Sequence, residues 1–387
     1  MSEQNSFDIV VVGGGPAGIM AAQHASKNGK SVCLIDRKEK IGYPVRCGEG
    51  IGLKGFGISN SIRDEWIRCR VNTLELFAPS GKSVSIRNGF NGFVVDRIKM
   101  ETDMTNEAVQ DGTCFIAGTE VTDAFANKNI YSCVTSKGTF TCKCLILADG
   151  IESRIARNFG WKTALSLNDI HTCATAVVSN IAIKDDSCAL YLGQKKAPGG
   201  FIWIFPRSDT SANIGLGISG KYSTPGKPME LLNNFLSAHF PKATITEVHA
   251  GGVPMGRWVR PLVKDGVMLV GDAARQMNCL NGAGINYSLF AGKAAGIIAA
   301  QSINGDTCNH KILKRYEKIW AREFGKQQER SYALKEAMIH FTDDFMNEMA
   351  DSILMQKEGK MSLMKLFLKA FSSKPFLMYK VYKLFSS

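Results

Sequence analysis

Residues 8–36 constrain the fold of this chain more than any other stretch, because they follow the order strand, glycine turn, helix, second strand. Ile9–Val12 is a short run of β-branched residues, which is typical of a strand buried on both faces of a parallel sheet. A helix is predicted from Ala17 to about Lys27, before the helix-terminating pair Asn28-Gly29. A second strand is predicted over Ser31–Ile35. This order predicts the first unit of a Rossmann-type α/β domain.

The glycines between the first strand and the helix match a dinucleotide-binding turn. Gly13 permits the tight turn, Gly15 lets the backbone approach a pyrophosphate, and Gly18 lets the helix lie close to the strand. The helix N-terminus directs its free amides toward the phosphates. Asp36 ends the second strand, where its carboxylate can accept the ribose hydroxyls of an adenosine. The stretch therefore predicts a dinucleotide-binding site.

The composition is that of an ordinary globular protein. The chain has 387 residues, enough for two domains or one large one, of which 45% are hydrophobic and 21% charged. No apolar run reaches the roughly 18 residues of a transmembrane helix, and the N-terminus lacks the basic and apolar regions of a signal peptide. The eleven cysteines form no CxxC pair, so we expect free thiols in a reducing cytosol, without a disulfide framework or a metal site.

Half of the net charge of +12 lies in the last part of the chain. Lys357–Ser387 contains seven lysines and one glutamate, which gives +6. Residues 360–372 are amphipathic at helical spacing, with the lysines away from the apolar face. This segment is either a packed terminal helix or a helix that lies on an anionic membrane surface, and we favour the membrane. The basic segment lacks the aromatic side chains on which nucleic-acid binders stack bases, so no nucleic-acid partner is expected.

A loop that follows the second strand carries candidate catalytic groups. Residues 41–50 contain three glycines and a proline, which forbid regular structure, together with Cys47 and Glu49. The loop is either an active-site loop or a structural turn with an inert thiol.

Two later strands run into aspartates. Thr139–Leu147 precedes Ala148-Asp149-Gly150, and Gly266–Val270 precedes Gly271-Asp272. Open parallel sheets bind ligands at the carboxyl ends of their strands, so both aspartates are expected at the ligand edge. Gly282 and Gly284 then open a helix, predicted over 286–303, whose free amides could meet a carbonyl or a phosphate. The small residues of this helix are expected to pack closely against the sheet.

Residues 163–253 change to the pattern of an antiparallel sheet, which a hairpin predicted over 71–86 would join. Phe201, Trp203 and Phe205 lie at period two and share one face of a strand. These aromatic side chains either fill the core of the sheet or form a wall that lines a pocket for an apolar ligand.

Together these motifs resemble the geranylgeranyl reductases, FAD-dependent flavoproteins of the wider p-hydroxybenzoate hydroxylase-like superfamily. The resemblance is carried by GGGPAG with Asp36, PVRCGEG, ADG at 148–150, GGFIWIFP and GDAARQMNCLNGAGI, in the family's order over residues 8 to about 300. It implies hydride transfer from reduced FAD to carbon–carbon double bonds of isoprenoid chains in a lipid, quinone or pigment.

The predicted fold class is α/β, in three parts. Residues 1–70, 89–162 and 254–305 form a discontinuous Rossmann-type FAD-binding domain. Residues 71–88 and 163–253 form an antiparallel β-sheet substrate domain, and 306–387 form a C-terminal helical region that could associate with a membrane.

The resemblance also implies roles for single residues. Cys47 and Glu49 are the candidate catalytic residues, with Cys47 either packing on the flavin or relaying a proton, and Phe201, Trp203 and Phe205 would grip the prenyl chain. The resemblance implies FAD contacts at Ala17, Asp36, Cys47, Gly48, Gly50, Arg97, Val121, Asp272, Gly284 and Ile285, and the glycine turns described above add Gly13, Gly15, Gly18 and Gly282.

Three positions depart from the family pattern. Asp36 stands where the family often has glutamate, Phe201 replaces the tyrosine of PxxYxWxFP, and Asn278-Cys279 replaces an Asn-Pro pair. The last two changes affect the expected substrate more than the expected chemistry.

Two other functions stay open at this point. A flavin monooxygenase of an aromatic or other apolar substrate would have the same fold, and a membrane-bound electron carrier would need no deep apolar tunnel. No second GxGxxG follows a strand, so the electron donor could be NAD(P)H, a ferredoxin or a reduced quinone. We expect a prenyl-chain lipid or quinone as substrate and a cytoplasmic enzyme, peripheral on the inner face of the membrane.

Overall fold

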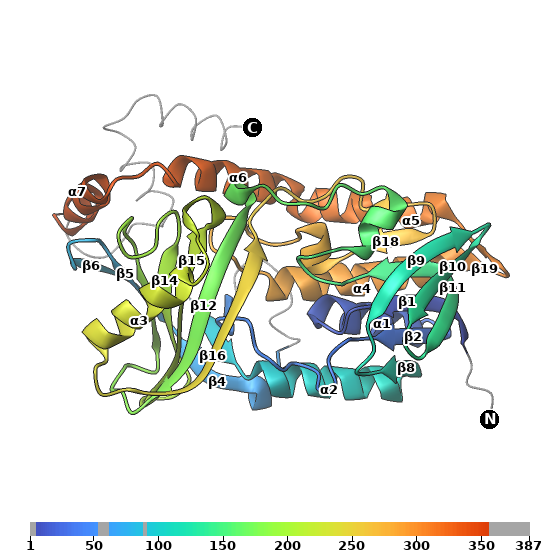
Figure 1. The fold of residues 1–387 in the computed structure, drawn as a ribbon, viewed down its shortest axis with the longest axis horizontal. Helices are drawn as coiled ribbons and strands as arrows, with labels where there is room; N and C mark the ends of the chain where they lie inside the picture. The colour runs from blue at the N-terminus through green and yellow to red at the C-terminus, as the bar shows by residue number, and fades with distance from the viewer. Residues whose placement is uncertain (1–4, 53–61, 88–90, 356–387) are drawn as a thin grey trace. The chain divides into compact units, whose positions relative to one another are not determined.

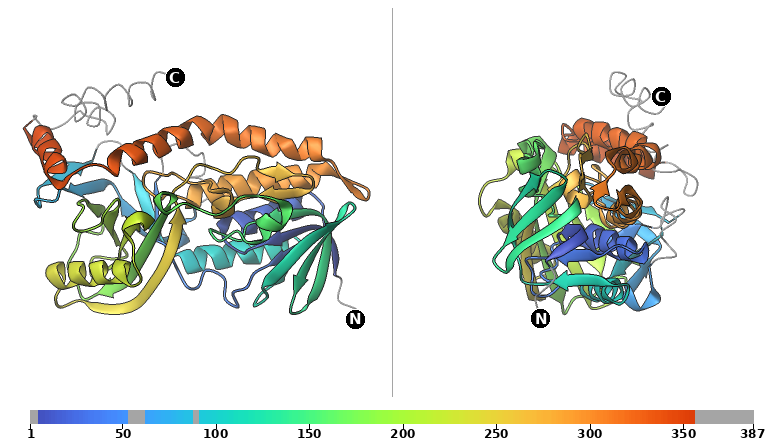
Figure 2. Two further views of the ribbon diagram at one scale, coloured as in Figure 1. Left: turned by 45° about the horizontal axis from the view of Figure 1, so that its top comes forward. Right: turned by 90° about the vertical axis from the view of Figure 1, so that its right-hand side faces the viewer.

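The computed structural model describes residues 5–52, 62–87 and 91–355, and the chain divides into two units (Figure 1, Figure 2). The first unit comprises Met1–Val45, Arg97–Leu165 and Pro254–Gln328. The second unit comprises Arg46–Asp96, Ser166–Val253 and Glu329–Ser387.

An eight-stranded sheet forms the centre of the first unit. Its main path runs through β17 (Val263–Lys264), β18 (Val267–Leu269), β11 (Gly138–Leu147), β1 (Ser6–Val12), β2 (Val32–Ile35) and β8 (Thr113–Ile116), and β9 (Val121–Asn127) and β10 (Ile130–Thr135) extend from β11. The strands from β18 to β8 are parallel, as the βαβ pattern predicted. Ile9–Val12 is buried, which confirms that β1 is covered on both faces.

The α-helices in the described part of the first unit include α1 (Pro16–Lys27), α2 (Arg97–Gln110), α4 (Ile285–Ser302) and α5 (His310–Trp320), and the π-helical turn η7 (Ala321–Gly325) follows α5. The prediction that the small residues of α4 pack against the sheet is wrong, because they pack against α1. A Cβ added at Gly292 would overlap the carbonyl group of Ala17, and one added at Gly296 would overlap that of Ala21. Glycine therefore lets two helix backbones touch. Figure 2 shows α5 alongside α4.

A seven-stranded sheet forms the centre of the second unit. It runs through β16 (Thr244–Pro254), β12 (Ile170–Ser179), β15 (Ser211–Ser219), β14 (Phe201–Pro206), β13 (Ser187–Tyr191), β5 (Thr73–Phe77) and β6 (Ser83–Ile86). The predicted hairpin is confirmed as β5 and β6, which are antiparallel. The sheet is not antiparallel throughout, because β5 pairs with β13 in parallel. A three-stranded sheet of β3 (Gly50–Gly52), β7 (Gly92–Val95) and β4 (Ile67–Val71) completes this unit.

The two faces of the seven-stranded sheet differ. One face is covered by α3 (Lys227–His239), which contacts β12 and β15 (Figure 1). This face carries Ile202, Ile204, Ile214 and Leu216, which pack with Leu232 and other apolar residues of α3. Alternation along β14 places Phe201, Trp203 and Phe205 on the other face. α3 was not predicted from the sequence, although the apolar spacing of residues 232, 235 and 236 is typical of a helix that packs on one face.

The division differs from the predicted domains in several places, and it contains no separate third part, because Glu329–Ser387 is grouped with the second unit. Residues 46–52, 62–70 and 91–96 belong to the second unit, because β4 and β7 share a core cluster with β5, β6 and β13 of the seven-stranded sheet. Residues 306–328 belong to the first unit, because α5 packs on α4 and β17.

The remaining α-helices of the described residues are α6 (Lys326–Met338) and α7 (Asp343–Leu354). The predicted amphipathic segment at 360–372 lies outside the described residues. Within the described part of the chain, no helix is both long enough and apolar enough to span a membrane.

Candidate active site

The glycine turn of the first unit forms the predicted cradle. Gly13 has a φ of +106°, and a Cβ there would lie 2.7 Å from the carbonyl carbon of Ala148, so only glycine fits beside the ADG turn. A Cβ at Gly18 would overlap the carbonyl group of Gly13, which confirms the close approach of helix and strand. At Gly15 nothing lies within 4 Å of the Cβ position, which leaves room for a ligand to approach the backbone.

The N-terminus of α1 fits a pyrophosphate. The N-cap of α1 is Gly15, which has no side chain that could cap the helix, and the first turn contains no acidic residue. Its amides are thus not capped by a side chain, and the helix dipole favours an anion there. The N–H of Gly14 donates to Oδ2 of Asp36, and the N–H of Lys38 donates to Oδ1 at 2.6 Å. These bonds hold the buried carboxylate beside the turn and leave lone pairs for ribose hydroxyls.

The second cradle of this unit joins β18 to α4. Gly282, at a φ of +72°, turns the chain toward Gly284, which is the N-cap of α4 without a side-chain cap. A Cβ at Gly284 would lie 3.7 Å from Oδ1 of Asp272, so the carboxylate stands at the open end of the helix. Burial raises the pKa of Asp272, and the positive charge of Arg97 opposes that rise.

The other FAD contacts implied for this unit have different surroundings. Nε of Arg97 donates to Oε1 of Glu101 within α2 at 2.8 Å, so its guanidinium is already engaged. Ile285 is the first residue of α4 and Val121 the first of β9, and both are buried.

Asp149 is a site residue that the implied contacts missed. Its Oδ1 is buried, and no donor among the described residues reaches it. Burial raises the pKa of Asp149 to about 6. An acceptor left without a donor next to the glycine turn is suited to a hydroxyl of a bound cofactor. With the two open helix termini and Asp36, it gives a set of groups that fits FAD. The signal in the sequence was the aspartate at the end of β11.

In the second unit, the CGEG loop and the aromatic strand β14 form one site. A Cβ at Gly48 would lie 2.9 Å from Cε2 of Phe205 and 3.1 Å from Nε1 of Trp203. A Cβ at Gly50 would lie 2.9 Å from the same ring carbon of Phe205. The ring of Trp203 lies 6.3 Å, centroid to centroid, from those of Phe201 and Phe205. Two motifs more than 150 residues apart are therefore in contact. This contact favours the active-site loop over the isolated structural turn.

Polar groups hold the two candidate catalytic residues in place. Glu49 is 2% exposed and has a φ of +66°, and its Oε2 lies 3.7 Å from Nε of Arg207. The N–H of Glu49 donates to Sγ of Cys47 at 3.3 Å. Asn213 donates to the carbonyl oxygen of Cys47 at 2.9 Å. Neither Arg207 nor Asn213 was predicted from the sequence. The available signal for Asn213 was an amide within the apolar strand β15.

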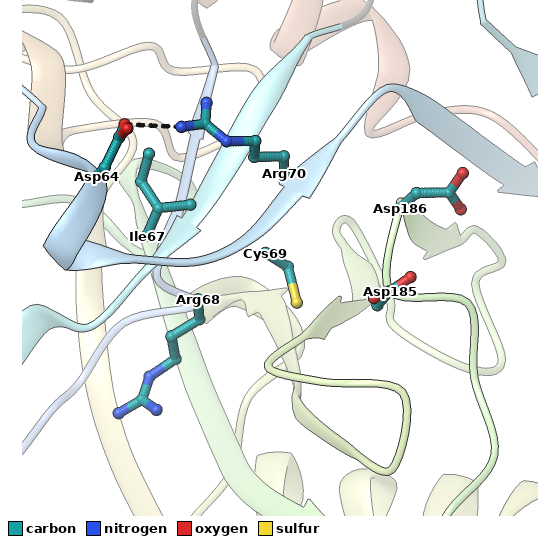
Figure 3. A pocket seen from close by; sticks show the side chains of 7 residues that line it. All are labelled: Asp64, Ile67, Arg68, Cys69, Arg70, Asp185 and Asp186. Atoms are coloured by element: carbon teal, nitrogen blue, oxygen red, sulfur yellow. Dashed lines mark hydrogen bonds and ion pairs between the residues drawn. The ribbon is translucent and has the colours of Figure 1, made fainter.

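A pocket elsewhere in the second unit does not involve the predicted site (Figure 3). It is lined by Asp64, Ile67, Arg68, Cys69, Arg70, Asp185 and Asp186. Both of its arginines are paired, Arg70 with Asp64 at 2.7 Å and Arg68 with Asp96 at 2.6 Å. These pairs account for the arginine charges, so we assign no function to the pocket.

Comparisons with known proteins agree with both halves of this description. Residues 169–253 match the model of the geranylgeranyl reductase catalytic domain, and residues 8–42 match that of the FAD dependent oxidoreductases. Digeranylgeranylglycerophospholipid reductase 1 of Methanococcoides burtonii is 33% identical over 99% of this chain and 96% of its own length.

Solved structures agree as well. The crystal structure of a geranylgeranyl bacteriochlorophyll reductase-like protein from Thermoplasma acidophilum has a TM-score of 0.89 at 26% identity, covering 98% of this chain and 100% of that one. A flavin-dependent brominase has a TM-score of 0.67 at 18% identity, covering 90% of this chain and 91% of its own, and shares the fold alone.

The fold class, the FAD dependence and the reductase interpretation predicted from the motifs are therefore confirmed, and the monooxygenase and electron-carrier alternatives are not favoured. The residue-level FAD contacts stay predictions. This chain belongs to the geranylgeranyl reductase family and is an FAD-dependent oxidoreductase.

Proposed function

We propose that this protein uses reduced FAD to saturate carbon–carbon double bonds in the geranylgeranyl chains of a glycerophospholipid. The main support is the similarity, along 99% of the chain, to a digeranylgeranylglycerophospholipid reductase. The joined CGEG loop and aromatic strand supply apolar surface and a thiol in one place, which suits an alkene substrate.

FAD, when bound and reduced, supplies the hydride for one alkene carbon. An isolated alkene has no oxygen that the protein can polarise, so orientation and exclusion of water must provide much of the rate acceleration. Trp203 and its aromatic neighbours orient the chain. Cys47 supplies the proton for the second carbon from its Sγ, and it is half-buried with that sulfur fixed by the N–H of Glu49. Glu49 turns the backbone and pairs with Arg207.

The electron donor and the cellular location belong to the same proposal. The absence of a second GxGxxG motif after a strand supports a donor that docks transiently, either NAD(P)H or a ferredoxin. The +6 charge of residues 357–387 supports peripheral binding to the inner face of the membrane, from which the lipid would be drawn.

The reaction can be tested in a single turnover. FAD-loaded protein is reduced chemically under anaerobic conditions and mixed with a digeranylgeranylglycerol phospholipid, and flavin absorbance and lipid mass are followed. We expect the flavin to be reoxidised and the lipid to gain two hydrogens per flavin, whereas the fully saturated lipid should leave the flavin reduced. Flavin that stays reduced until oxygen is admitted, followed by an oxygenated product, would contradict the proposal.

The role of Cys47 is tested in the same assay. Cys47→Ala should retain FAD and lose about 10²-fold or more in the rate of flavin reoxidation, because general acid catalysis contributes a factor of that order. If Cys47→Ala were reoxidised at the wild-type rate, Cys47 would not be the proton donor.

Membrane binding is tested separately, by sedimentation of the full chain with anionic and with zwitterionic vesicles. Replacement of the lysines at 365, 369 and 374 by glutamine should release the protein from the anionic vesicles. Equal binding to anionic and zwitterionic vesicles would contradict the proposal that the C-terminal lysines bind anionic lipids.

A further inference from the structure

We propose that Asn213 is a positioning residue, which ties the loop of Cys47 to the indole of Trp203 so that thiol and aromatic wall keep one fixed relation. The inference rests on the function proposed for this site and adds to it the residue that holds its two halves together.

Asn213 lies on the aromatic face of the seven-stranded sheet. It is 2% exposed and pairs in register with Phe205 on β14 and with Val177 on β12. Its neighbour Ile214 packs toward α3 on the opposite face, as alternation requires. An amide buried at such a position is costly unless all its hydrogen-bonding groups are satisfied.

The side chain of Asn213 uses both donors and both acceptor sites of its amide. Oδ1 accepts from Nε1 of Trp203 at 2.9 Å and from Oγ1 of Thr175 at 2.8 Å. Nδ2 donates to the carbonyl oxygen of Cys47 at 2.9 Å and to Oε2 of Glu49 at 3.3 Å. The indole can only donate and the carbonyl oxygen can only accept. The Oδ1 of Asn213 must therefore face Trp203 and its Nδ2 must face Cys47.

Steric contacts with neighbouring residues restrict the position of the Trp203 ring. A Cβ at Gly215 would lie 2.7 Å both from Cε2 of the indole and from the carbonyl oxygen of Ala174, so the ring occupies space that any other residue would fill. Gly48 meets the Nε1 edge of the same ring. The indole is therefore held against Gly215 of β15 with its N–H directed at Asn213.

The loop itself needs an external partner. Glu49 has a φ of +66°, a backbone conformation that is unfavourable for a residue other than glycine. Asn213 bonds to the residues on either side of Gly48 and so stabilises this conformation. Without the amide, Arg207 would be left to hold the carboxylate at 3.7 Å.

Asn213→Asp distinguishes positioning from simple packing. The variant keeps the shape and the acceptors but loses the donors, and it places a second carboxylate beside Glu49. Among the described residues, the other charged or titratable groups at the site are Arg207, Cys47 and Cys173, and Cys173 interacts electrostatically with Cys47. Since two adjacent carboxylates disfavour double ionisation, protonation at mildly acidic pH restores a donor. We expect a loss of about 10²-fold in kcat near neutral pH and a partial recovery on acidification that the wild type does not show.

Asn213→Leu and Ser219→Ala complete the set. Asn213→Leu removes every bond and should lose kcat at all pH values. Ser219→Ala changes a buried hydroxyl at the far end of β15 that has no partner among the described residues, and it should leave kcat unchanged. FAD content and thermal unfolding are measured for each variant, so that lost folding is separated from lost positioning.

A second measurement needs no lipid substrate. The rate at which Cys47 is alkylated, followed by peptide mass mapping, should rise about tenfold in both Asn213 variants, because the freed loop exposes the thiol. Wild-type protein that fails to reduce lipid while its variants still show faster alkylation would refute the proposed function and leave the positioning intact. Wild-type kcat in Asn213→Leu, or an unchanged alkylation rate with no acidic recovery in Asn213→Asp, would overturn the inference.

Discussion

A methyl group at Gly292 should separate α4 from α1 and weaken the binding of FAD. A Cβ at this position would overlap the carbonyl oxygen of Ala17 and lie 2.9 Å from both its carbonyl carbon and Cβ of Met20. Real Cβ atoms do not approach so closely, and two of these three atoms belong to the backbone of α1. The helices must therefore move apart, because no rotation of a side chain relieves the overlap.

The cost follows from two opposing terms. Replacing glycine by alanine inside a helix gains about 1 kcal/mol from helix propensity. Overpacking against a rigid neighbour costs about 1–3 kcal/mol, and the backbone contact places Gly292→Ala near the upper end. A net loss of about 2 kcal/mol in the free energy of unfolding is expected. Ala17 lies in the first turn of α1, so FAD affinity should fall about tenfold, which corresponds to 1.4 kcal/mol.

Urea unfolding and FAD titration measure these two effects. The matched control is Gly325→Ala in the π-helical turn η7, where the nearest atom to the Cβ position is Cβ of Ala321 at 3.8 Å. The control should be as stable as the wild type or up to about 1 kcal/mol more stable. If Gly292→Ala were as stable as the control and bound FAD with wild-type affinity, the argument from helix contact would fail.

Three further changes test buried groups of the separate units. Burial raises the pKa of Asp149 to about 6. The wild type should therefore lose up to ~3 kcal/mol in the free energy of unfolding as pH rises from 3.8 through 6. The urea midpoint of Asp149→Asn, measured against pH, should not show this loss. Burial, followed by the charge of Lys335, lowers the pKa of His171 to about 4, so the wild type loses about 3 kcal/mol as pH falls from 6.5 to 4; a His171→Gln variant with the same acid sensitivity would contradict this assignment. Tyr316→Phe removes a buried hydroxyl bonded to Oε1 of Gln276 at 3.0 Å and should cost about 1–3 kcal/mol, seen as a lower Tm, whereas an unchanged Tm would mean that the bond is not needed.

Short-range patterns were enough to predict much of the first unit. β1, α1 and β2 lie where the run at Ile9–Val12, the glycine turn and Asn28-Gly29 predicted them. The aspartates after β11 and β18 stand at the ends of parallel strands for the same reason. Such elements depend on residues a few positions apart, whose periodicity and turn chemistry can be read directly along the chain.

Contacts between distant segments lay beyond this kind of reasoning. The sequence suggested the small-residue surface of α4 but not that α1 covers it. It also did not show that β3 and β4 both pair with β7. Periodicity shows which face of an element is apolar; it does not show which other element covers that face.

By itself, the sequence determined the FAD-binding half, the family and the two motifs CGEG and FIWIFP. The tertiary structure alone decided that these motifs meet, that Gly48 and Gly50 lie against Phe205, and that one amide at Asn213 bonds to both. The physical reason is that a buried polar network is defined by directions and distances among residues that only the completed sheet brings within hydrogen-bonding range.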